Sequence, residues 1–247
     1  MIHPQAKNRF VLVDASRGAA VILMVCYHFC FDLNYFGLIH QDFNDSSFWL
    51  TCRAIIVTSF LTIVGVSLVL ASNKNRRHFW MRIGKLFAAS LLVTSGSYLM
   101  FPQSFIFFGI LHFIAVSSLI ASLFLRFFWL NLVLGSATAL FGMFYSNLWF
   151  DQPWLQWIGF MTYKPVTEDY VPLFPWLGVV LIGLFLGKFL FQTSSVRLPP
   201  VLKLKKDGLT PPTRWVTGPA WLGQHSLAIY LLHQPILIGT LYLLFGH

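Results

Sequence analysis

Residues 11–38, VLVDASRGAAVILMVCYHFCFDLNYFGL, form an apolar segment long enough to cross a bilayer, and they include the ionisable residues Asp14, Arg17, His28 and Asp32. On insertion scales a charged side chain near the bilayer centre costs about 2.5 to 3.5 kcal/mol. A helix that served only as a membrane anchor would not carry these side chains. We therefore interpret this segment as the functional part of the chain.

The composition of the chain is that of a membrane protein. Hydrophobic residues make up 57% of the 247 residues, charged residues make up 10%, and the mean hydropathy is +0.69. A span of the hydrocarbon core needs about 20 apolar residues. We predict an all-α, polytopic membrane helix bundle with about seven transmembrane helices in a single domain covering residues 1–247. The predicted spans are residues 11–38, 48–72, 83–101, 105–125, 127–149, 172–191 and 222–245.

The basic residues are distributed unevenly between the two sides of this bundle. The net charge is +9, and 15 of the 17 Lys and Arg residues lie within residues 7–17, 74–85 and 188–214 or at Arg126. In the seven-span arrangement all of these positions are on one side, which the positive-inside rule makes cytoplasmic. We predict a cytoplasmic N-terminus and a periplasmic C-terminus. Because the charge follows the membrane sides, it does not indicate nucleic-acid binding.

The four ionisable residues of the first span share one helical face at 100° per residue. Arg17 lies near the cytoplasmic boundary, where its planar guanidinium suits a phosphate-bearing ligand. His28 and Asp32 are one turn apart, so the carboxylate can orient the imidazole for general-base catalysis. The structural alternative is an ion pair of Asp14 with Arg17 and a buried His–Asp hydrogen bond that serves packing only.

Other spans contribute further residues that could line a cavity next to this face of the first span. Each of these side chains, taken singly, is more often a polar contact between helices than a reactive group. Arg53 can also form a structural ion pair with Asp32 or Asp42. The candidates are His112, His225, Tyr230, His233 and Arg53.

Several features outside the spans are also informative. Residues 192–220 contain two Pro-Pro pairs and a basic run, and we predict an extended surface loop. Residues 150–171 mix aromatic residues with acids and prolines, which favours a position in the membrane interface over a pocket cap. Gly183 and Gly187 predict close helix packing. The sequence contains no Walker A, GxGxxG, HExxH or CxxC motif.

Several blocks of this sequence resemble the bacterial DUF1624 family, which is related to the catalytic domain of heparan-alpha-glucosaminide N-acetyltransferase. The spacing of Asp, Arg and His in the first span also resembles that of the acyltransferase-3 family. The blocks are VDASRG (13–18), MVCYHF (24–29) with Asp32-Leu33, FGILH (108–112), DYVPLFPWLG (169–178) and GQHSLAIYLLHQP (223–235).

The resemblance implies transfer of an acyl group, usually acetyl, from cytoplasmic acetyl-CoA to an acceptor reached from the other side of the membrane. It assigns Arg17 to the CoA entry, where we also place Asp14 and His225, and it matches His28 to the acyltransferase-3 catalytic histidine. In heparan-alpha-glucosaminide N-acetyltransferase, which is a lysosomal enzyme, an asparagine stands at the position that matches His28. The proposed catalytic histidine of that enzyme follows at a position near His40. His40 is therefore a further candidate.

We therefore expect a membrane acetyltransferase that needs no metal. It would act on a sugar hydroxyl or amine of an envelope glycan or glycolipid, in a bacterial inner membrane. The expected partners are the lipid bilayer and that acceptor, with no nucleic acid, and the oligomeric state is left open. Two other functions are a proton-coupled transporter that uses His28 and Asp32 as a relay and a non-catalytic membrane scaffold.

Overall fold

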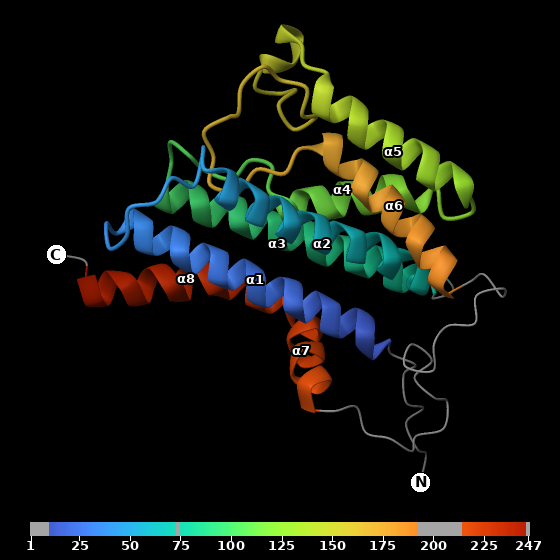
Figure 1. Ribbon diagram of the computed structural model, residues 1–247, viewed down its shortest axis with the longest axis horizontal. Coiled ribbons are helices and arrows are strands. Elements are labelled where there is room, and N and C mark those ends of the chain that lie inside the picture. The colour runs from blue at the N-terminus through green and yellow to red at the C-terminus, as the bar shows by residue number, and fades with distance from the viewer. Residues whose placement is uncertain (1–9, 73–74, 192–213, 246–247) are drawn as a thin grey trace. The chain divides into compact units, whose positions relative to one another are not determined.

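A computed structural model describes residues 10–72, 75–191 and 214–245 of the chain (Figure 1). These residues form eight α-helices and one short 3-10 helix, and they contain no strand. The elements in chain order are α1 (Val11–Tyr35), α2 (Ser47–Ala71), α3 (Arg76–Met100), α4 (Ile110–Ser122), α5 (Trp129–Phe144), η1 (Leu148–Asp151), α6 (Leu173–Phe191), α7 (Arg214–Gln224) and α8 (Ser226–Phe245).

Five of the described helices, α1, α2, α3, α6 and α8, are long and apolar enough to cross a membrane. They confirm the predicted all-α, polytopic membrane fold. Each predicted span contains a helix, but α4 and α5 have only 13 and 16 residues. At 1.5 Å per residue these two helices measure about 20 Å and 24 Å, which is less than the hydrocarbon core of roughly 30 Å. The seven-span topology and its orientation stay a prediction.

The predicted span 105–125 was wrong at its start, because α4 begins only at Ile110. The backbone of Ile106 forms hydrogen bonds with side chains of α3 and takes no part in the backbone hydrogen bonds of α4. Its N–H donates to Ser97 Oγ at 2.9 Å, and its carbonyl accepts from Thr94 Oγ1 at 2.7 Å. These two bonds hold the residues before Gly109 in a loop against α3.

Two further boundaries differ from the sequence prediction. The helix α3 begins at Arg76, because the Asn75 side chain accepts a hydrogen bond from the Arg77 N–H at 3.0 Å and caps its first turn. Arg76, Arg77 and Arg82, which lie between the predicted spans 48–72 and 83–101, are therefore helical. At the other boundary, α7 replaces the end of the predicted extended loop. The remainder of that loop (192–213), Lys74 and residues 1–9 lie outside the described residues.

The described residues fall into two compact units. The first contains α1, the loop after it, α2 as far as Ile56, α7 and α8; the second contains α2 from Val57 and α3 to α6. The single-domain organisation stays a prediction. Each unit is internally packed around helices of its own.

In the first unit, α1 packs on both α7 and α8. Figure 1 shows α8 running alongside α1 in the same direction, while α7 turns away from that axis. The contacts of His28 with His233 and of Asp32 with Gln234 follow the same direction along the two helices. In the predicted seven-span topology the first and the last span both cross the membrane from the cytoplasmic to the periplasmic side, and such spans are parallel.

In the second unit, α6 packs closely on α5 and on the second part of α2. A Cβ atom on Gly183 would lie 2.5 Å from the Thr62 carbonyl oxygen, and one on Gly187 would lie 3.0 Å from Val66 Cα. Only glycine allows this approach, so the close packing predicted from the two glycines is confirmed.

Candidate functional site

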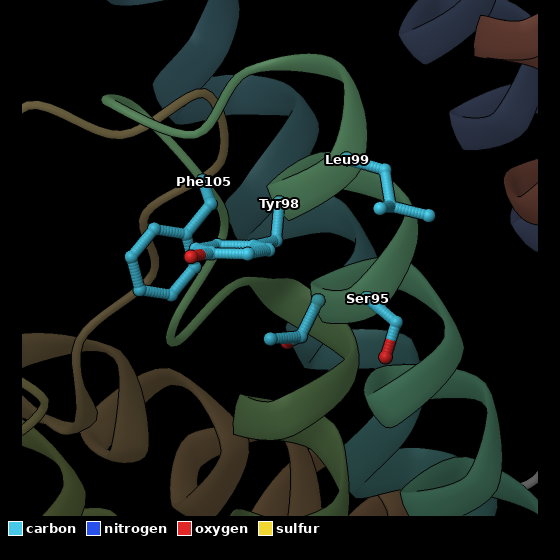
Figure 2. Close-up of a pocket in the computed structure, with 5 residues that line it drawn as sticks. Ser95, Tyr98, Leu99 and Phe105 are labelled. Atoms are coloured by element: carbon cyan, nitrogen blue, oxygen red, sulfur yellow. The ribbon is translucent and has the colours of Figure 1, made fainter.

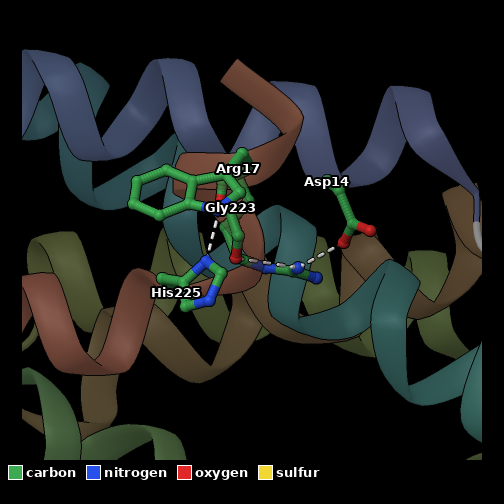
Figure 3. Close-up of polar contacts among 5 residues, drawn as sticks. Asp14, Arg17, Gly223 and His225 are labelled. Carbon is green, nitrogen blue, oxygen red and sulfur yellow. Dashed lines mark hydrogen bonds and ion pairs between the residues drawn. The ribbon is translucent and has the colours of Figure 1, made fainter. Parts of the chain in front are cut away.

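The N-terminal part of α1 is joined to the end of α7 through Arg17 (Figure 3). The Arg17 Nη1 atom lies 2.8 Å from Asp14 Oδ1, in an ion pair one turn apart, and 3.5 Å from the Gly223 carbonyl oxygen. The Gly223 carbonyl belongs to the last turn of α7, where the helix dipole favours a positive charge. The predicted Asp14–Arg17 pair is confirmed, and the structure adds its contact with α7.

Two glycines make this contact between α1 and α7 possible. A Cβ on Gly18 would lie 1.8 Å from the Pro219 carbonyl oxygen, and a Cβ on Gly223 would lie 1.8 Å from the Asp14 carbonyl oxygen. Any larger residue at either position would force the helices apart. The same two backbones hold Arg17 beside the turn between α7 and α8.

His225 occupies that turn and is exposed. Its ring lies over Trp221 with centroids 4.5 Å apart, and its Nδ1 lies 2.9 Å from the Trp221 carbonyl oxygen. Because a carbonyl oxygen only accepts, Nδ1 carries a proton and donates it to this oxygen. This end of the first unit therefore presents a guanidinium, an exposed imidazole and an exposed indole.

Farther along α1, His28 meets His233 of α8. The two ring centroids are 4.9 Å apart with an interplanar angle of 65°. His233 is buried, and its Nδ1 lies 2.7 Å from the Tyr230 carbonyl oxygen. Nδ1 must therefore donate, which makes Nε2 the basic nitrogen of neutral His233. The structure thus places two imidazoles against one another between two apolar helices.

Asp32 lies one turn after His28 and is 2% exposed. Its Oδ1 accepts a hydrogen bond of 2.7 Å from Gln234 Nε2, a residue that the sequence analysis did not select. Orientation of His28 by Asp32 stays a prediction, and the structure adds a contact of Asp32 with Gln234 and one of His28 with His233. We call His28, Asp32, His233 and Gln234 the α1–α8 polar cluster.

Aromatic side chains adjoin the α1–α8 polar cluster on α1. Tyr27 lies next to His28 and contacts the rings of Phe43 and Trp49, each with centroids 5.7 Å away. Phe43 is 4% exposed and stacks on Trp49 at 4.2 Å. The loop after α1 is therefore held against the helix by Phe43.

The remaining candidates of the first unit are placed as follows. His40 is exposed in the loop after α1, and Arg53 lies in the second turn of α2. Within the described residues the structure shows no ion pair of Arg53 with Asp32 or Asp42, which was a possible structural role. The Asp42 carboxylate accepts N–H bonds from its own turn. Tyr230 contacts the His233 ring at 5.7 Å.

His112 belongs to the second unit, where both of its ring nitrogens are hydrogen-bonded. Nδ1 accepts from the Gly109 N–H at 3.3 Å, so Nε2 carries the proton and donates to Thr94 Oγ1 at 3.1 Å. The Thr94 hydroxyl in turn donates to the Ile106 carbonyl at 2.7 Å. The imidazole accepts from the N-cap N–H at the start of α4, as a Glu or Gln at position N3 does in a capping box, while Gly109 has no side chain for the reciprocal bond.

Asp169 completes the cap of α4. Its Oδ2 accepts from the Ile110 N–H at 2.8 Å, and a Cβ on Gly109 would lie 2.3 Å from the same oxygen. Two of the sequence blocks, residues 108–112 and 169–178, therefore meet at this helix end. Their side chains fix a helix start, which is a structural role.

An open pocket of about 300 Å³ adjoins this region in the second unit, and Figure 2 shows its lining. The lining residues are Thr94, Ser95, Tyr98, Leu99 and Phe105. The pocket is mostly apolar, and the Thr94 hydroxyl is already committed to Ile106. Its lining includes no His, Cys, Asp or Glu side chain. Among the described residues there is no group of three or more His, Cys, Asp or Glu side chains that could hold a metal.

Comparisons with known proteins agree with this description of the chain. The family model described as "Heparan-alpha-glucosaminide N-acetyltransferase, catalytic" matches residues 9–235. Neither the search of curated proteins nor the search of solved structures found a match. The matched region includes α1, the caps of α4 and the α1–α8 polar cluster. The chain therefore belongs to the family of the heparan-alpha-glucosaminide N-acetyltransferase catalytic domain, a family of membrane acetyltransferases.

Proposed function

We propose that this protein transfers an acetyl group from cytoplasmic acetyl-CoA to a sugar hydroxyl or amine of an envelope glycan or glycolipid, in a bacterial inner membrane. The family match supports the class of reaction. The observation that carries the assignment of the site is the contact of His28 with His233, next to buried Asp32, between α1 and α8. An imidazole in such surroundings is suited to general-base catalysis.

The two ends of the first unit have different chemical capacities. Arg17 and His225 are suited to the phosphates of CoA, because a guanidinium presents a planar set of N–H donors and the exposed His225 imidazole can donate from Nε2 when that nitrogen is protonated. The exposed indole of Trp221 offers a flat face for an adenine ring. We place the donor at this end and the acceptor nearer to the α1–α8 polar cluster.

Two routes are consistent with the cluster. In the direct route, His28 or His233 takes the proton from the acceptor hydroxyl or amine as its oxygen or nitrogen attacks the thioester carbonyl. The C–S bond then breaks, and the imidazolium returns the proton to the CoA sulfur. In the covalent route, one imidazole nitrogen attacks the thioester carbonyl, the C–S bond breaks and CoA leaves as the thiolate. The acceptor hydroxyl or amine then attacks the acetyl-imidazolium and releases the first histidine, and the acceptor's proton passes through the second histidine to the CoA sulfur. Asp32 stabilises the cationic form of the histidine in either route.

The test follows isotope-labelled acetyl-CoA into envelope glycans and lipids of membranes that contain the protein. We expect these molecules to gain the mass of one labelled acetyl group with the natural protein and not with His28→Ala. His78→Ala is the matched control, because His78 is an exposed histidine of the first turn of α3. Full labelling by folded His28→Ala would remove His28 from the mechanism.

A proton-coupled transporter is the second candidate, because buried histidines beside a carboxylate also form proton relays. Binding of acetyl-CoA distinguishes the two functions. A ligand at one hundred times its Kd stabilises the native protein by about 2.7 kcal/mol. We expect acetyl-CoA to raise the Tm of the purified protein. No shift at millimolar acetyl-CoA, together with solute uptake driven by a proton gradient, would favour the transporter.

A further inference from the structure

The segment after α5, residues 145–163, is irregular and carries large apolar side chains on its surface. Leu148 is 76% exposed, and Trp149 and Trp154 are each 64% exposed. Figure 1 shows this segment between the end of α5 and the start of α6. In water such a surface would be unfavourable, so its surroundings need an explanation.

The segment rests on a cluster of aromatic rings that holds it in one conformation. Phe160 is 8% exposed and contacts the rings of Phe141, Tyr145, Phe150 and Phe174 at 4.6 to 5.5 Å. Because these rings pack against one another, the backbone of the segment is held in one conformation. Its outward tryptophans are therefore held in place on the surface.

Several polar groups of the segment are bonded within it or by Tyr170, which follows it. The Asp151 carboxylate accepts from both the N–H and the hydroxyl of Thr162, each at 2.7 Å. The Trp154 indole donates to Gln152 Oε1 at 2.8 Å. The Tyr170 hydroxyl donates to the Gln156 carbonyl at 2.6 Å, and burial raises the pKa of Tyr170, so this donor stays protonated. Internal pairing of this kind suits a region of low water content.

The charge pattern also points to lipid. Residues 145–163 contain a single charged residue, Asp151, which is paired with Thr162. A water-exposed connection of this length would be expected to carry more charges. The stretch instead has the composition of the aromatic belt at a membrane boundary.

The length of α5 supplies the last observation. This helix has 16 residues, so it covers about 24 Å of a hydrocarbon core of roughly 30 Å. The exposed side chains near its end, Met143 and Phe144, continue into Leu148 and Trp149 of η1. The apolar surface therefore extends past the end of the helix.

We propose that residues 145–163 form a membrane-interface platform, in which Leu148, Trp149 and Trp154 insert into the bilayer interface and complete the apolar surface that α5 leaves short. The bound partner is the lipid surface itself. This proposal is independent of the acetyl-transfer function, because it depends only on the chain being an integral membrane protein.

The test uses nitroxide labels on the full-length chain in lipid vesicles, after replacement of its three free cysteines by alanine. Labels at Trp149→Cys and Trp154→Cys are expected to collide several times more often with oxygen, relative to a water-soluble nickel chelate, than a label at Val166→Cys. Val166 is the matched control, because it is 80% exposed and lies between Lys164 and Glu168. Equal collision ratios at all three positions would overturn the proposal.

A second measurement uses the natural tryptophans, so it tests the proposal even if the labelled cysteine variants misfold. Lipids brominated near the headgroup quench tryptophans at that depth, so the Trp149→Phe, Trp154→Phe double variant should lose part of the quenchable fluorescence. An unchanged quenched fraction would contradict insertion. Protection of these tryptophans by a soluble oligosaccharide, with no quenching by lipid, would assign the surface to a sugar and also overturn the proposal.

Discussion

His112 in α4 and the His28–His233 pair of α1 and α8 are histidines of apolar helices with different surroundings. Both nitrogens of His112 are bonded, one to the Gly109 N–H and one to a Thr94 hydroxyl whose own proton is committed. His28 instead lies against a second imidazole whose tautomer leaves Nε2 basic. A histidine that is saturated by the backbone specifies structure, whereas two histidines in contact beside a carboxylate can move a proton.

The largest expected effect is on the α1–α8 polar cluster. His28→Ala and His233→Ala should each lower the rate of acetyl transfer by about 10² to 10⁴-fold, the usual contribution of a general acid or base. The measurement is the incorporation of labelled acetyl per mole of folded protein in detergent. If either variant keeps the natural rate, that histidine belongs with His112 as a structural residue.

Replacement of Asp32 by Asn tests whether activity of the α1–α8 polar cluster requires the negative charge of Asp32 or only a hydrogen-bond acceptor of the same size. The Asn side-chain oxygen can still accept from Gln234, but it no longer stabilises an imidazolium. We expect a loss of about 10- to 100-fold in turnover with little change in Tm, since charged hydrogen bonds contribute about 1.5 to 3 kcal/mol. Unchanged turnover in Asp32→Asn would limit Asp32 to packing α1 against α8.

Glutamine substitution compares the two kinds of histidine directly. Gln at position N3 bonds the N-cap N–H in many helices, so His112→Gln should keep the bond to Gly109 and keep activity. At position 28, Gln offers no basic nitrogen, so His28→Gln should be as inactive as His28→Ala. The readout is acetyl transfer per folded molecule. An inactive but stable His112→Gln would contradict the structural role of His112.

The smallest expected effect is on stability at α4. His112→Ala removes the acceptor of the Gly109 N–H and the donor to Thr94, and we expect it to lower the free energy of unfolding by about 1 to 2 kcal/mol. Turnover per folded molecule should stay close to that of the natural protein. The Tm in detergent measures the loss, and His78→Ala is the control for a histidine without side-chain contacts of this kind.

Part of the site was predictable from the sequence because it lies on one helix. The face shared by Asp14, Arg17, His28 and Asp32 follows from helical periodicity alone, and its ion pair is present. The partner of Asp32 was not predictable, because Gln234 is 202 positions away and looks like an ordinary polar residue after His233. The motif at residues 108–112 was visible, but its meaning as a helix cap required the Thr94 and Gly109 contacts.

The sequence by itself determined the membrane class, the helical fold and the helix that carries the chemistry, because hydropathy, charge and helical spacing are local properties of the chain. The tertiary structure alone decided which histidines face one another and which is saturated by hydrogen bonds. It also replaced the end of a predicted loop with α7, whose contact with α1 depends on Gly18 and Gly223. These outcomes depend on the packing of segments far apart in the chain, and no local pattern specifies such packing.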